Sequence, residues 1–315
     1  MRIAVYLPLL LPLLAPLGAR LLSEHCEPRL ATWLLTAAAA AAVGLGAAST
    51  LSLGLLAATA AIRIPLLAAL GDWSANSAKH QDPTELSVAL IAGLLLGGAV
   101  LAAARMLWRR ARSLAAAAID AACMPARDGL VVVEDETPDA FALPGLPGRV
   151  IVSTGMLHTL DQAEHSILLA HERAHLAAHH YLFVALTQLG ATVNPMLRPL
   201  AGSVTYTIER WADENAVAAT GDRTRVARTV GKAALATRHT LARTPGAALG
   251  ILGHRKGRLA GAGPVPRRVA ALLAPPLTLH RGLTLATVAV LAVAAWSSAE
   301  AAHDLHLLLR SAGAA

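Results

Sequence analysis

The stretch LLAHERAHLAAHH (residues 168–180) places four histidines, a glutamate and an arginine in a run of alanine and leucine. Each unpaired polar group buried in such a setting costs about 1–3 kcal/mol. Residues 171–175 have the form H-E-x-x-H. On a helix, positions i and i+4 lie on one face about 6 Å apart, so both imidazoles can bind one cation. The sequence therefore predicts a helix that carries two ligands of a metal ion, His171 and His175.

Glu172 directly follows the first of these histidines and is expected beside the metal rather than on it. Its carboxylate can hold a water there and take its proton, which is the task of a general base in a zinc hydrolase. The alternative is a pair of solvated or core histidines, which apolar surroundings make costly unless a metal compensates them. A capping box at Asp161 and Glu164 predicts where the helix begins.

A tetrahedral zinc site that leaves one position for water needs a third protein ligand. Glu209 is the strongest candidate, because it lies on a second predicted helix, TIERWADENAVAATG, that ends at Gly221. Asp213 follows one turn later on the same face and can accept the free ring N–H of a ligand histidine. The alternative for both carboxylates is a solvated helix face, and we interpret Glu214 in that way.

The remaining histidines near the motif are weaker candidates. His179 and His180 are rival ligands, but their position directly after an occupied helix face favours a surface role or a hydrogen bond to a ligand. We expect no role in the site for His158 and His165.

The composition is that of a membrane protein, with 55% hydrophobic and 15% charged residues and a mean hydropathy of +0.53. The net charge of +7 comes from arginines beside apolar segments, which favours contact with lipid over nucleic acid. Aromatic residues make up only 3%, which argues against stacking on single-stranded nucleic acid. Cys26 and Cys123 form no disulfide framework, which fits a reducing cytoplasm.

Four apolar segments predict membrane spans at about residues 3–22, 30–62, 86–107 and 283–301. A signal peptide is the alternative for the first segment, and a hairpin of two spans is the alternative for the second. The distribution of arginines places the N-terminus outside and the middle of the chain in the cytoplasm. We therefore expect a membrane region at 1–108, a cytoplasmic domain at 109–280, and a last span with a short tail at 281–315.

The middle region predicts short strands at residues 129–136 and 148–154. Residues 181–208 hold a single charge, Arg198, and Asn194-Pro195 interrupts them, which predicts a helical hairpin on or in the membrane. The expected fold class is a mainly α membrane protein with about four transmembrane helices. A cytoplasmic α+β, zincin-like domain with a small β-sheet completes it.

H-E-x-x-H followed by E-x-x-x-D, with apolar spans around it, resembles the membrane gluzincins. The chain is similar to the BlaR/MecR antirepressor metallopeptidases and, more distantly, to the HtpX and CAAX proteases. The stretch VIVSTGMLHTLDQAEHSILLAHERAH (150–175) is similar to both groups. NPMLRPL (194–200), VPRRVAALLAPP (265–276) and the order of the spans favour the first. The resemblance covers most of residues 109–276.

The resemblance implies a fold with one Zn²⁺ held by His171, His175 and Glu209, with Glu172 as general base and Asp213 supporting a ligand. It also implies that Asp139, Ala140 and Phe141 form an edge strand that pairs with the substrate backbone. A plain loop is an equal alternative for these three residues.

The implied activity is a membrane zinc endopeptidase with a regulatory role in signalling, which inactivates a repressor by cleavage. The alternatives are membrane protein quality control, as in the HtpX group, and a catalytically silent signalling protein with structural zinc. The intact Glu172 argues against the silent protein, because a structural site has no need of it. The expected partners are a protein substrate and membrane lipid, without direct contact to nucleic acid. Only about 14 residues follow Ala301, where the β-lactam sensors carry a large binding domain, so we expect a different signal input.

Overall fold

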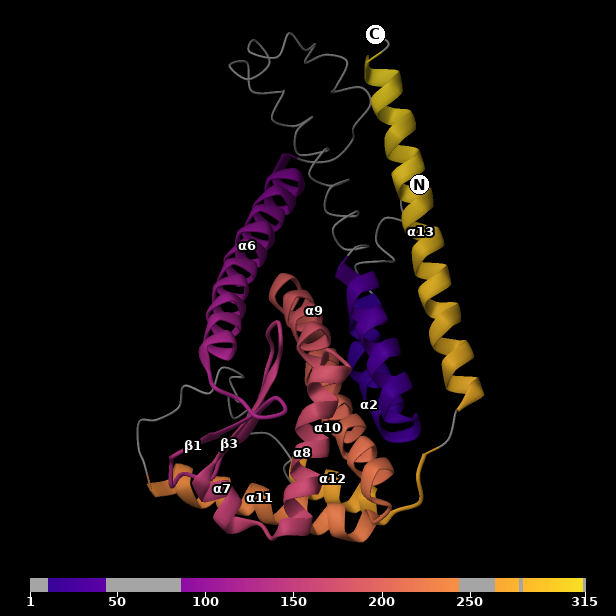
Figure 1. Cartoon of the computed structure of the whole chain (residues 1–315). Helices are drawn as coiled ribbons and strands as arrows, with labels where there is room; N and C mark the ends of the chain where they lie inside the picture. Colours follow the sequence, from indigo (N-terminus) through magenta and orange to yellow (C-terminus); the bar gives the residue numbers. More distant parts are fainter. Residues whose placement is uncertain (1–10, 44–85, 244–263, 278–279, 314–315) are drawn as a thin grey trace.

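The computed structural model describes residues 11–43, 86–243, 264–277 and 280–313 (Figure 1). The described part begins with a 3₁₀ turn, η1 (Leu11–Leu14), and a short helix, α2 (Ala15–His25). A further helical stretch covers residues 28–43. The predicted segments over 3–10 and 44–62 lie outside the described residues.

A long helix, α6 (Leu86–Cys123), leads into three strands, β1 (Leu130–Val133), β2 (Ala140–Leu143) and β3 (Arg149–Ser153). β3 lies in the middle, parallel to β1 and antiparallel to β2. The two strands predicted from the sequence are thus confirmed as β1 and β3. β3 is buried over most of its length, with α6 against one face of the sheet and α8 against the other.

Two helices follow the sheet directly, α7 (Thr154–Thr159) and α8 (Gln162–Ala177). The predicted capping box at the start of α8 is confirmed: Glu164 N donates to Asp161 Oδ1 at 2.8 Å, and Asp161 N donates to Glu164 Oε2 at 2.9 Å. Lys232 lies 2.6 Å from the same Glu164 carboxylate. A cap of this kind stabilises a helix by about 0.5–2 kcal/mol and fixes the residue at which α8 begins.

The predicted break at Asn194-Pro195 is confirmed, because it separates α9 (His180–Val193) from the 3₁₀ turn η2 (Pro195–Leu197) and α10 (Arg198–Thr220). Gly221 ends α10 in the left-handed region at φ 74°. The start predicted for this helix is wrong. α10 runs unbroken from Arg198, since Pro199 lies in the first turn, where a helix tolerates proline, and Gly202 is exposed.

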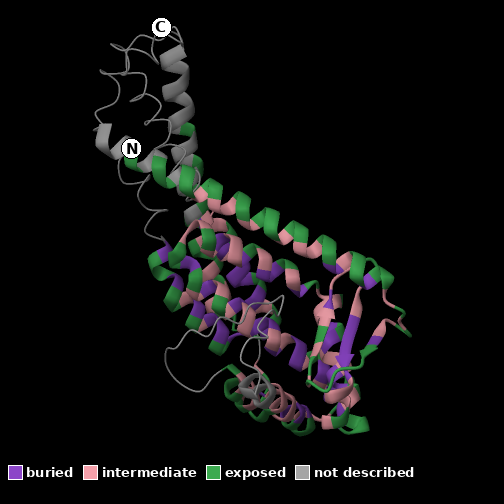
Figure 2. Ribbon diagram, turned by 90° about the vertical axis from the view of Figure 1, so that its left-hand side faces the viewer, coloured by how far each residue is buried: buried purple, intermediate pink, exposed green. Residues whose placement is uncertain are grey.

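Three helices complete the described chain: α11 (Arg223–Arg243), α12 (Pro264–Leu273) and α13 (Arg281–Gly313). α8 packs against α10, and α11 packs against α12. One core cluster joins all four helices, made of Ile167, Ala216, Val226, Ala227 and Leu272. Figure 2 shows that the buried residues gather inside this assembly and on the strands. Burial of one such aliphatic side chain stabilises the fold by about 1.5–3 kcal/mol.

The mainly helical architecture with one small sheet agrees with the predicted fold class. The predicted membrane spans are a different matter. Among the residues that the structure describes, no helix combines the length and the apolar character needed to cross a membrane. The expectation of about four transmembrane helices is therefore unsupported. α6 begins at Leu86, where the third predicted span begins, and continues beyond residue 107 to Cys123.

Candidate metal centre

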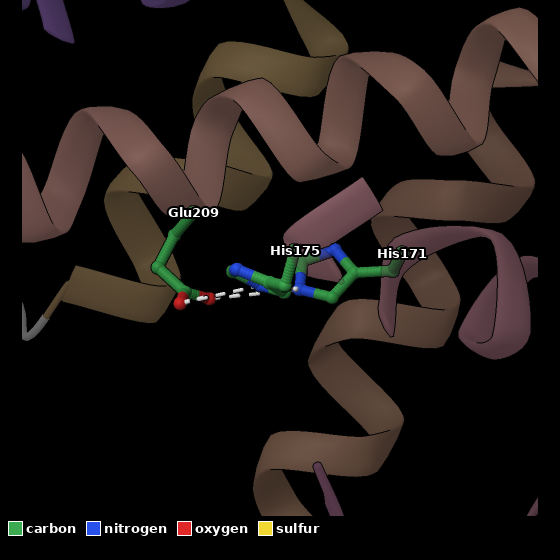
Figure 3. Close-up of side chains that lie close together, drawn as sticks. All are labelled: His171, His175 and Glu209. Carbon is green, nitrogen blue, oxygen red and sulfur yellow. Dashed lines mark hydrogen bonds and ion pairs between the residues drawn. The ribbon is translucent and has the colours of Figure 1, made fainter. Parts of the chain in front are cut away.

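The packing of α8 on α10 brings two imidazoles and a carboxylate to one point (Figure 3). His171 and His175 come from successive turns of α8, and Glu209 comes from α10. The two Nε2 atoms are 3.2 Å apart. Oε2 of Glu209 is 3.6 Å from His171 Nε2, and Oε1 is 3.7 Å from His175 Nε2. The three donors named from the sequence thus converge in space.

These distances fit a tetrahedral zinc ion. Bonds of about 2.0–2.1 Å to nitrogen and oxygen put neighbouring ligand atoms about 3.3–3.4 Å apart. The three measured separations, 3.2, 3.6 and 3.7 Å, lie close to this value. Two histidines, one carboxylate and one position for water make up a donor set of the catalytic type. The residues present can therefore hold zinc with small movements of the side chains.

Asp213 supports the first histidine from behind. It follows Glu209 by one turn on α10, is 1% exposed, and places Oδ1 3.1 Å from His171 Nδ1. His171 thus donates from Nδ1 and keeps Nε2 directed at Glu209. This arrangement selects the tautomer of the ring that can bind a metal through Nε2.

Arg268 of α12 lies against both carboxylates of α10. Its Nε and Nη2 donate to the two oxygens of Asp213 at 2.8 and 2.6 Å, and its Nη1 donates to Glu209 Oε2 at 2.8 Å. A planar fork of this kind fixes the orientation of a carboxylate as well as its charge. Sequence reasoning gave this arginine no role. The neighbouring Arg267 has the same local signal, yet its guanidinium lies over the Tyr206 ring, 4.4 Å from the centroid.

The pKa values of His171 and His175 shift in opposite directions. Burial by itself would lower the pKa of His171, but hydrogen bonds to Asp213 and Glu209 outweigh it and raise the pKa to about 10. Burial lowers the pKa of His175 to about 4, and the attraction of Glu209 offsets only part of this effect. Burial would raise the pKa values of Glu209 and Asp213, but their hydrogen bonds and nearby positive charges lower both.

Glu172 is 8% exposed, between the two ligand histidines in the sequence. Burial raises the pKa of its carboxyl to about 7. The positive charge of His171 lowers this pKa in part, and the negative charge of Glu209 raises it further. A group that gains and loses a proton near neutral pH is suited to act as a base and then as an acid.

The weaker candidates fall into separate places. His180 is buried and contacts His175, whereas His179 is exposed. His165 Nε2 lies 2.8 Å from the Leu157 carbonyl oxygen and links α8 to α7. Within the described part of the chain, His158 makes no contact with the three candidate ligands. Glu214 pairs with Arg223 at 2.7 Å, and both side chains are about a quarter exposed.

The residues expected to bind substrate lie at the edge of the sheet. Ala140 and Phe141 belong to β2, and Asp139 precedes it. β2 pairs with β3 on one side and has no strand on its other side among the described residues. It packs on α8, the helix that carries both histidines. Phe141 is 36% exposed, and the Asp139 amide donates to Ser153 Oγ at 2.9 Å.

Comparison with known proteins gives one match to a protein family. Residues 103–216 match the model of peptidase family M48. This segment contains the sheet, the three ligand residues, Glu172 and Asp213, and it ends before Arg268. No curated protein matches the chain, and no solved structure does. The family match supports a metallopeptidase, a hydrolase that depends on a metal and typically on zinc. It does not decide between the two groups that the sequence resembles.

Proposed function

We propose that the protein is a zinc-dependent endopeptidase with a regulatory role. The observation that carries this proposal is the convergence of His171, His175 and Glu209 beside a buried Glu172. A structural zinc site is closed by four protein ligands, whereas these three leave a position for water. Bound zinc would act as a Lewis acid toward a peptide carbonyl and toward this water.

The side chains of the chain itself then have distinct tasks. Glu172 accepts a proton from the attacking water at its carboxylate and later donates it to the leaving amine. Its pKa of about 7 permits both steps at neutral pH. Asp213 and Arg268 keep His171 and Glu209 in place, so that the ligand geometry does not need to be rebuilt during turnover.

The open edge of β2 is the proposed binding surface for the substrate backbone. An unpaired strand edge offers N–H and C=O groups to an extended peptide, and alternate side chains of the peptide then face the protein. Asp139, Ala140 and Phe141 supply this edge. The proposal rests on the position of β2 against α8 and on the family resemblance.

Substitution of Glu172 with glutamine tests the enzymatic role. The amide has nearly the same shape but cannot take a proton, so we expect cleavage to fall about 10²–10⁴-fold while zinc stays bound. Peptide cleavage and zinc content are measured on the same preparation. Undiminished cleavage by the variant would exclude Glu172 as the base, and undiminished function in cells with no cleavage at all would favour a silent signalling protein.

The proposed substrate is a regulatory protein, of the type of a cytoplasmic transcriptional repressor. This step rests on the resemblance to the BlaR/MecR group. The Glu172→Gln variant binds substrate without release, so crosslinking in cells followed by mass spectrometry identifies the captured protein. Capture of a DNA-binding regulator supports the proposal, and capture of diverse misfolded membrane proteins would support quality control instead.

We also propose that the protein works at the cytoplasmic membrane. Large apolar side chains stand exposed on the two long helices, with Leu94 77% and Trp108 66% exposed on α6 and Trp296 76% exposed on α13. Contact with lipid would remove such apolar side chains from water. Cell fractionation with alkaline carbonate extraction tests this location, and recovery of the chain in the soluble fraction would contradict it.

A further inference from the structure

His180, the first residue of α9, is the least explained polar side chain near the metal centre. It is 2% exposed, and its Nδ1 lies 2.9 Å from Nδ1 of His175. Its other ring nitrogen, Nε2, is buried and has no hydrogen-bond partner among the described residues. A buried nitrogen without a partner destabilises the fold, so its presence calls for a reason.

The backbone conformation between α8 and α9 fixes the position of the His180 ring. α8 ends at Ala177, and His179 adopts the left-handed conformation with φ 50° and ψ 43° before α9 begins. Residues other than glycine seldom adopt this conformation. The bend at His179 sets the direction in which α9 leaves the end of α8, and the side chain of His180 lies against His175 of the preceding helix. Strain of this kind persists where the surrounding contacts fix it.

Two imidazole nitrogens 2.9 Å apart need one proton between them. One Nδ1 must donate and the other must accept. If His175 donates, its Nε2 is free of hydrogen and can bind a metal. If His180 donates, neutral His175 carries its proton on Nε2, which points at His171 Nε2 and Glu209 and cannot then coordinate. The pair therefore has two hydrogen-bonded arrangements, and only one is compatible with a metal ligand.

We propose that His180 is a positioning residue that accepts the Nδ1 proton of His175 and so holds this ligand in the tautomer that binds zinc. His180 does for the second histidine what Asp213 does for the first, without a charge. In this arrangement His180 keeps its own proton on the buried Nε2. The Trp211 ring lies against the His180 ring, with the two ring centroids 4.6 Å apart and the planes inclined by 56°. An aromatic ring is a weak acceptor for an N–H group.

The inference rests on the proposed metal site, and its test measures metal binding rather than cleavage. Zinc dissociation constants of the purified full chain are obtained by competition with a chromophoric chelator. We expect His180→Leu to bind zinc about 10–100-fold more weakly, which is the usual loss for a partner behind a ligand histidine. His180→Asn should recover most of the affinity, because its amide oxygen can accept from His175 Nδ1 at nearly the same place.

The matched control is His179→Asn, which replaces the neighbouring exposed histidine with a residue that also tolerates the left-handed conformation and leaves the pair intact. It should bind zinc like the wild type. Equal affinity of the wild type and His180→Leu would overturn the inference while the proposed enzyme stands. Absence of zinc binding in the wild type would instead overturn the metal site itself, and the inference with it.

A spectroscopic measurement decides the point even if His180→Leu does not fold. In zinc-loaded wild-type protein with ¹⁵N-labelled histidine, the proton of His175 is expected on Nδ1 and that of His180 on Nε2. The His180 signal is assigned by its loss in His180→Asn. A proton on Nδ1 of His180 in the loaded protein would contradict the proposal.

Discussion

His171 and His175 belong to one motif and to successive turns of one helix, yet their surroundings are opposite. His171 donates to a buried carboxylate that Arg268 holds with two further hydrogen bonds. His175 contacts the neutral imidazole of His180, which in turn packs against the Trp211 ring. Hydrogen bonds to the carboxylates raise the pKa of His171 to about 10, whereas burial lowers the pKa of His175 to about 4. Two histidines of one motif can thus have pKa values shifted in opposite directions, because each contacts residues from a different part of the chain.

The largest effect on stability is expected from a substitution that breaks the charged network behind His171. Asp213→Asn leaves the buried Arg268 with only Glu209 as a partner, and loss of one member of a buried pair costs about 3–5 kcal/mol. The free energy of unfolding of the metal-free protein, measured in urea, should fall by roughly that amount. Zinc affinity should fall about 10–100-fold, as expected when a ligand histidine loses its acceptor. A change under 1 kcal/mol would mean that the charged network does not stabilise the fold.

The metal-free protein should lose stability on both sides of about pH 6.5. The raised pKa of His171 gives stability that is fully present below 6.5 and is lost as the pH rises toward 10. The lowered pKa values of His175, about 4, and His180, about 3, act in the other direction, since both histidines gain a proton below 6.5 in the unfolded chain and stay neutral in the folded chain. The raised pKa of Glu172, about 7, opposes them between 4.5 and 7, but the two histidines outweigh this one carboxyl. We expect a change on the order of a few kcal/mol on each side. Urea unfolding over pH 4–10 measures this profile, and Asp213→Asn should flatten mainly its alkaline side, because Asp213 is one of the two hydrogen-bond partners that raise the pKa of His171.

A smaller effect is expected from Arg268→Lys, which keeps the charge and removes the fork. The ammonium group cannot donate to both Asp213 oxygens and to Glu209 in the same planar geometry. We expect a loss of about 1–3 kcal/mol in the metal-free protein. Arg267→Lys on the neighbouring residue is the control, because that guanidinium contacts the Tyr206 ring rather than the ligands. Equal effects of both substitutions would show that the position of Arg268 is not special.

The smallest effect is expected from Glu214→Gln. Its pair with Arg223 has the same chemistry and a distance of 2.7 Å, but both side chains are about a quarter exposed. Water screens such pairs, and their contribution is about 0–1 kcal/mol. The thermal midpoint should hardly move, and zinc affinity should stay unchanged. A larger loss of stability than that of Asp213→Asn would reverse the proposed ranking of the two pairs.

Local signals in the sequence predicted the parts of the site that depend on neighbours in the chain. The spacing of His171 and His175 follows from the helical repeat, and the start of α8 follows from Asp161 and Glu164. The two β-branched runs predicted β1 and β3. The break before α10 followed from Asn194-Pro195, but the first turns of α10 were misassigned, because the absence of a breaker is a weaker signal than its presence.

The sequence alone determined which side chains could bind a metal, because helix periodicity fixes what shares a face. It could not determine what lies behind each ligand. Arg268 and Arg267 are adjacent and chemically identical, and only the packing of α12 on α10 turns one toward Glu209 and the other toward Tyr206. His179 and His180 are also adjacent and identical, yet His179 is exposed in the left-handed conformation and His180 is buried beside His175. Contacts between distant segments depend on how helices pack, and no local pattern records that packing.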